Sequence, residues 1–157
     1  MFNGAFTDLL LAALAAILVI AAVIDVRTFT ISNRLNLTVA LGAPLYWLSV
    51  ALQPWPGMAV QLAAGGIVFL LFAGAFYAGM MGGGDVKLAA ALALWFSPFA
   101  TLKFLVLTSI AGGVLTLVVL AWHHVRKLEG RPEVPYGVAI AFGGLAILGE
   151  RFLNQYA

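Results

Sequence analysis

Long apolar segments, separated by short polar or glycine- and proline-containing breaks, constrain this chain more than any other feature. A helix crosses the hydrocarbon of a bilayer in about 20 residues, with a range near 17–25. We expect six such helices over the segments Leu9–Ile24, Leu35–Leu52, Met58–Met81, Val86–Phe96, Phe104–Trp122 and Val134–Gly149. The predicted fold class is therefore all-α, a polytopic membrane helix bundle of about six transmembrane helices, with residues 1–157 forming a single membrane-embedded domain.

The scarcity of charge supports a membrane location. Charged residues make up 9% of the chain and hydrophobic residues 64%, whereas a soluble domain carries about 25% charged residues. A soluble enzyme and a nucleic-acid-binding protein are excluded on this ground, and membrane lipid is an expected partner. The chain has no cysteine, so disulfides, thiolate nucleophiles and cysteine-based metal sites are excluded.

The segment Val86–Phe96 is short for a transmembrane helix. The thirteen residues from Asp85 to Ser97 rise only ~20 Å along a helix. The segment is either buried within the bundle, or begins deep in the membrane, or is re-entrant.

The positions of the basic residues predict the orientation in the membrane. With alternating crossings, one side receives six basic residues and the other side receives Lys103 and Arg151. The larger set comprises Arg27, Arg34, Lys87, Arg126, Lys127 and Arg131. Because basic residues concentrate in cytoplasmic loops, we expect the larger set in the cytoplasm and both termini in the periplasm.

Asp25 and Asp85 are the acidic residues most suited to chemistry. Asp25 closes the first apolar segment and Asp85 follows a triple glycine at the start of the fourth, so both return to the cytoplasmic face. Two neighbouring carboxylates hold one proton between them. Such a pair can activate a water molecule and protonate a carbonyl oxygen or a leaving amine. The structural alternative is that Asp25 caps or pairs with Arg27 and that Asp85 is an N-cap for the fourth helix.

Other residues near Asp85 have weaker assignments. The glycines 82–84 allow a close approach of substrate backbone to Asp85, or else form a simple linker. Lys87 can reach toward Asp25, a substrate or a lipid phosphate, or can act as a basic membrane anchor. No histidine-based zinc motif is present, so no metal is expected. A dyad of Ser32 and Lys87 has no other support in the sequence.

Pairs of small residues spaced four apart predict close contacts between helices in lipid. Such pairs are Ala75 with Gly79, Ser109 with Gly113, and Ala139 with Gly143.

Three motifs resemble those of the type IV prepilin peptidases. They are Asp25-Val-Arg27-x-x-x-Ile31-x-Asn33, then Gly82-Gly83-Gly84-Asp85-Val86-Lys87-Leu88, and finally Val134-Pro135-Tyr136-Gly137-Val138-Ala139. The resemblance implies an aspartic endopeptidase of the bacterial inner membrane that cleaves the leader of type IV prepilins or pilin-like proteins. It implies Asp25 and Asp85 as catalytic residues. We expect Gly82, Gly84, Lys87, Arg27 and Asn33 to bind substrate or to support the pair.

The chain departs from the larger members of this family, which carry paired C-x-x-C motifs in a cytoplasmic insertion and also methylate the new pilin N-terminus. With no cysteine and a short first connection, it resembles the short, peptidase-only branch associated with Flp-type (tight-adherence) pili. No cofactor and no methyltransferase activity are therefore expected. The remaining alternative is a small transporter or channel subunit in which Asp25 and Asp85 bind a cation or a proton. The sequence does not set the oligomeric state.

Overall fold

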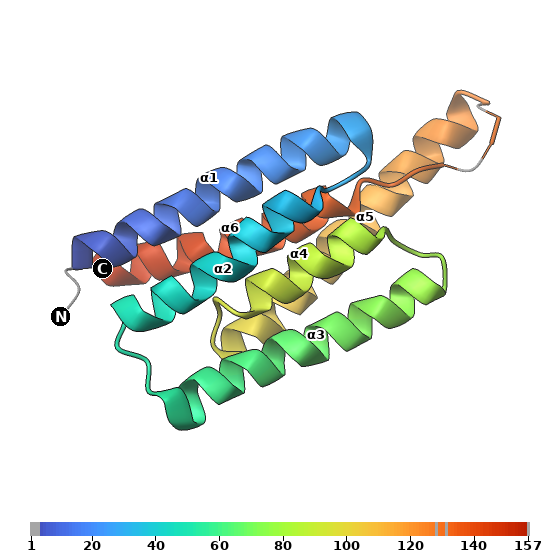
Figure 1. Ribbon diagram of the computed structural model, residues 1–157. Coiled ribbons are helices and arrows are strands. Elements are labelled where there is room, and N and C mark those ends of the chain that lie inside the picture. Colours follow the sequence, from blue (N-terminus) through green and yellow to red (C-terminus); the bar gives the residue numbers. More distant parts are fainter. Residues whose placement is uncertain (1–3, 128, 131, 157) are drawn as a thin grey trace.

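A computed structural model describes residues 4–127, 129–130 and 132–156, and within them the fold is a bundle of α-helices (Figure 1). In chain order the elements are α1 (Gly4–Thr28), α2 (Asn33–Ser49), the single turn η1 (Pro54–Met58), α3 (Ala59–Tyr77), α4 (Gly83–Ala93), α5 (Pro98–Val125) and α6 (Tyr136–Tyr156). The predicted all-α class and the six helices are confirmed.

The helix boundaries follow local capping chemistry. Helix α5 begins at Pro98 and not at the predicted Phe104, because the Ser97 side chain accepts a hydrogen bond from the Ala100 N–H at 3.3 Å and so caps the helix. Proline fits this first helical position, where its missing N–H has no intrahelical partner to lose. Helix α1 ends before Phe29, which has a φ of 51°.

Helix length separates the six helices into two groups. Four are long and apolar enough to span a membrane, at Gly4–Thr28, Pro54–Tyr77, Pro98–Val125 and Tyr136–Asn154. Helix α2 has 17 residues and α4 has 11, and α4 rises only about 16 Å. Most of α4 is buried, including Val86, Leu88 and Leu92, so the interpretation of this segment as a helix within the bundle is the one that fits.

Successive helices alternate in direction along the bundle (Figure 1). The connections after Thr28, Tyr77 and Val125 therefore gather at one end, which we call the connection end. The two termini and the connection after Ser49 lie at the opposite end, which we call the termini end. Helix α4 packs against α2, α3 and α6, and α6 also packs against α1 and α5.

The two predicted groups of basic residues lie at opposite ends of the bundle. Lys103 and Glu150 form an ion pair at the termini end, close to Arg151 in sequence. At the connection end, Lys87 of α4 bonds to Asn33 at the start of α2. Arg131 lies outside the described residues. The cytoplasmic location of the connection end stays a prediction.

Candidate active site

Asp25 lies in the last turn of α1 and is 2% exposed. Its Oδ2 accepts a hydrogen bond from the backbone N–H of Val138, at 3.2 Å, in the first turn of α6. The N-terminus of a helix presents unpaired N–H groups and a partial positive charge, which favour a nearby carboxylate. Helix α6 therefore supplies a polar partner for this buried carboxylate.

Gly137 allows this contact between α1 and α6. A methyl group added to Gly137 would lie 2.8 Å from both Cγ and Oδ2 of Asp25, and 2.5 Å from Cδ1 of Ile31. These distances are far below van der Waals contact, so any larger residue would displace Asp25 or Ile31. The motif that includes Gly137 does not reveal this role, because the contact of Gly137 with Asp25 depends on the fold.

Asp85 lies in the first turn of α4 and is 8% exposed. Its Oδ2 accepts a hydrogen bond from the backbone N–H of Gly82 at 3.2 Å. Gly82 is the N-cap residue, so the alternative that Asp85 is itself the N-cap is wrong. Asp85 instead stands three residues further on, where an acidic side chain reaches back to the cap.

The segment at Ile31 connects the two aspartates. A methyl group on Gly84, next to Asp85, would lie 2.6 Å from the Ile31 carbonyl oxygen, and the Ile31 side chain also abuts Gly137 beside Asp25. The two carboxylates interact electrostatically: burial and, secondly, the negative charge of Asp25 raise the pKa of Asp85 to about 6, opposed by the Gly82 N–H. The structure thus brings together two aspartates that are far apart in sequence.

Of the other predicted site residues, Lys87 and Asn33 bond to each other and not to either aspartate. The Lys87 ammonium donates a hydrogen bond to Oδ1 of Asn33 at 2.7 Å, so Lys87 fixes the start of α2 to α4. Arg27 is exposed. Among the described residues the ion pair found is Lys103–Glu150, so the alternative in which Asp25 pairs with Arg27 is wrong.

Asn36 is a residue of the site that the sequence analysis missed. Its Nδ2 donates a hydrogen bond to the Gly84 carbonyl oxygen at 2.9 Å, and the side chain is 4% exposed. A polar amide inside the apolar segment Leu35–Leu52 was the available signal, since such residues need a partner in a membrane. Asn36 holds the glycine loop against α2 directly before Asp85.

An open cavity of about 480 Å³ leads to Asp85 from the connection end. Its walls come from the segments after α1 and α3, from α5, and from the chain before α6, and they include Thr30, Gly82, Glu133 and Tyr136. A chain segment from outside can therefore approach Asp85. Within the described residues, no three histidine, aspartate or glutamate side chains form a group that could hold a metal ion.

Together, the bundle and the site define a helical membrane protein with a pair of buried, interacting carboxylates near one end. Comparison with known families agrees with the resemblance in the motifs. The model of the type IV leader peptidase family matches residues 12–117, a range that includes both aspartates. This chain belongs to the type IV leader peptidase family.

A curated relative is the prepilin leader peptidase/N-methyltransferase of Pectobacterium carotovorum subsp. carotovorum. It is 29% identical over 136 residues, which are 84% of this chain and 48% of the relative. The chain thus spans about half the length of the curated relative it matches. No solved structure matches the chain.

Proposed function

We propose that the protein is a prepilin leader peptidase, an aspartic endopeptidase in which Asp25 and Asp85 activate water. The observation that carries the proposal is the pairing of these two carboxylates around Ile31, each held by one backbone N–H. Family membership supports peptide hydrolysis, and the cavity beside Asp85 supports entry of an extended peptide.

The pair carries one proton in its reactive state. The ionised carboxylate takes a proton from water while the resulting hydroxide attacks the scissile carbonyl carbon, and the other aspartate gives its proton to the carbonyl oxygen. The neutral gem-diol intermediate then returns one hydroxyl proton to the aspartate that is now ionised, the C–N bond breaks, and the other aspartate gives its proton to the leaving nitrogen. One water molecule is consumed and the pair again holds a single proton.

The proposed substrates are type IV prepilins or pilin-like proteins of the Flp (tight-adherence) kind, cut at the cytoplasmic boundary of the inner membrane. Asp25 lies in the last turn of α1 and Asp85 in the first turn of α4, both at the connection end. A leader peptide in the cytoplasm can meet the pair there if the connection end faces that side. Peptidase activity without methyl transfer is proposed for this chain.

Co-expression with a candidate pilin, followed by a gel mobility shift, tests the proposal. Asp25→Asn and Asp85→Asn should each abolish cleavage, because asparagine keeps the side-chain size but cannot exchange the proton. Asp8→Asn, the same substitution near the termini end, should cleave like the wild type. Cleavage at the wild-type rate by either of the first two variants would refute the pair as the catalytic centre.

A transporter or channel subunit is the rival function from the sequence. Transporters typically bind their substrates and coupling ions near the bilayer midplane, whereas both aspartates here lie in terminal turns of their helices. The location of the pair therefore favours the peptidase.

A further inference from the structure

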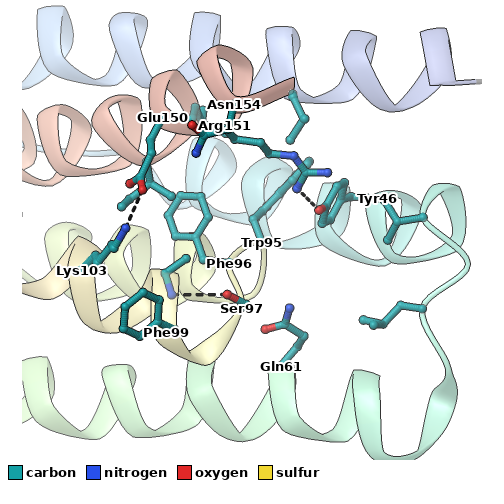
Figure 2. A pocket seen from close by; sticks show the side chains of 16 residues that line it. Tyr46, Gln61, Trp95, Phe96, Ser97, Phe99, Lys103, Glu150, Arg151 and Asn154 are labelled. Carbon is teal, nitrogen blue, oxygen red and sulfur yellow. Dashed lines mark hydrogen bonds and ion pairs between the residues drawn. The ribbon is translucent and has the colours of Figure 1, made fainter. Parts of the chain in front are cut away.

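A second cavity lies at the termini end, away from the aspartates (Figure 2). Its volume is about 480 Å³, within the range of sites for small ligands. It forms where the short α4 turns into α5, and Figure 1 shows this turn set back from the ends of α2, α3 and α6. The proposed function makes no use of this cavity.

Gln61 of α3 extends into the cavity with an unmet hydrogen-bonding need (Figure 2). The residue is 8% exposed, and its Oε1 is buried without a hydrogen-bond partner. A buried polar atom without a hydrogen-bond partner destabilises the folded protein. The nearby indole of Trp95 cannot supply the bond, because its N–H donates to the Val39 carbonyl at 2.9 Å. A ligand with a hydrogen-bond donor can satisfy Oε1 once the Gln61 amide, whose oxygen is covered by the chain in this structure, turns toward the cavity.

Arg151 of α6 brings a positive charge to the same cavity (Figure 2). Its guanidinium donates a hydrogen bond to the Tyr46 hydroxyl and lies 5.1 Å from the centre of that ring. Glu150, the neighbour of Arg151 in the sequence, pairs with Lys103. An arginine has five N–H donors and binds phosphate through them, so Arg151 can accept an anionic group.

The mouth of the cavity borders surface that is suited to hydrocarbon. Phe99, which lines the cavity, is 69% exposed, and Leu102 beside it is 59% exposed. The Lys103 ammonium lies 5.2 Å from the centre of the Phe99 ring. A cationic group beside exposed apolar side chains at the end of a membrane bundle is typical of the depth where lipid head groups meet acyl chains.

We propose that this cavity binds the head group of a membrane phospholipid that carries a hydrogen-bond donor. The phosphodiester is held by Arg151, the donor satisfies Oε1 of Gln61, and the acyl chains leave along Phe99. The site takes a phospholipid such as phosphatidylethanolamine, whose ammonium is a donor, in preference to phosphatidylcholine, which has the same net charge and no donor.

The test uses the purified full chain in detergent, with the unfolding midpoint followed during titration with short-chain lipids. Dihexanoyl phosphatidylethanolamine should stabilise the wild type at about tenfold lower concentration than dihexanoyl phosphatidylcholine, as expected for one additional hydrogen bond. Gln61→Leu should abolish this difference. If the leucine variant does not fold, Gln61→Met is used in its place, because methionine is unbranched and similar in length to glutamine.

Arg151→Met should weaken the binding of both lipids about tenfold, because a charge-assisted contact is lost. Arg126→Met is its matched control, because Arg126 also stacks on an aromatic ring, 4.5 Å from the centre of Trp122, outside the cavity. Equal affinities of the two lipids for the wild type, or an Arg151→Met variant that binds like Arg126→Met, would overturn the proposal. Equal stabilisation by glycerophosphoethanolamine, which has no acyl chains, would overturn the lipid assignment in favour of a soluble phosphodiester.

Discussion

At the scale of single residues, the aspartates depend on glycines that leave room for them. Asp25 reaches the N–H of Val138 only because Gly137 has no side chain. The sequence motif made Asp25 a candidate, but this steric requirement could not be predicted, since the two residues are joined only when α1 and α6 pack. Residues 113 positions apart become neighbours in the fold.

The first residue-scale prediction concerns Gly137→Ala. The added methyl group would overlap Cγ of Asp25 and should reduce the initial rate of pilin cleavage by roughly tenfold or more, because a small displacement of a catalytic group is costly. The control is Gly149→Ala in the same helix, where an added methyl group meets nothing within 4 Å. A Gly137→Ala variant as active as Gly149→Ala would show that Asp25 does not need its present position.

The second residue-scale prediction concerns pH. Burial and the charge of Asp25 raise the pKa of Asp85 from 3.8 to about 6. The ionised form of Asp85 is therefore disfavoured in the folded protein, so the stability contributed by the neutral form is complete below pH 3.8 and is lost as pH rises through about 6. The unfolding midpoint of Asp85→Asn minus that of the wild type should therefore increase as the pH rises from about 4 to about 7. A difference between the two proteins that does not change with pH, measured by scanning fluorimetry, would contradict the raised pKa.

At the scale of helices, the sequence located each element better than it located the faces in contact. The four-residue spacing of Ala139 and Gly143 predicted a contact face, and both residues are buried. Ser109 and Gly113 were predicted in the same way, but both are exposed. Helix α5 instead presents Thr108 and Gly112 to α6, where a methyl group added to Gly112 would lie 3.5 Å from the Tyr136 ring. Spacing alone does not distinguish these adjacent faces when both carry small residues.

Gly143→Ala tests this packing. The methyl group would lie 2.3 Å from Oγ1 of Thr108 and 3.2 Å from the Phe104 carbonyl oxygen, so α5 and α6 would have to separate. We expect a loss of about 1–3 kcal/mol in the free energy of unfolding, the usual cost of overpacking. Gly113→Ala, which meets nothing within 4 Å, should be neutral or slightly stabilising by helix propensity. Equal unfolding midpoints for the two variants would argue against the observed contact face.

At the scale of the whole molecule, apolar segments and their breaks were sufficient to predict six helices, and the motifs were sufficient to nominate Asp25 and Asp85. Other features depend on tertiary contacts. Asn36 joins the site through the Gly84 carbonyl oxygen, and Arg151 reaches Tyr46 across 105 positions of sequence. Such contacts have no local pattern, because they arise from which helices become neighbours.

The orientation of the whole bundle in the membrane gives the last prediction. The chain has no cysteine, so single cysteines can report each end without a background. Ser32 and Glu129 are exposed in connections at one end, and Gln53 is exposed in the turn at the other. With the basic residues of the connection end in the cytoplasm, a membrane-impermeant thiol reagent should label only Gln53→Cys in intact spheroplasts. Ser32→Cys and Glu129→Cys should label after lysis, which serves as the control for accessibility. Labelling of Ser32→Cys before lysis would place Asp25 and Asp85 on the outer side, where a cytoplasmic leader cannot reach them, and would favour the transporter instead.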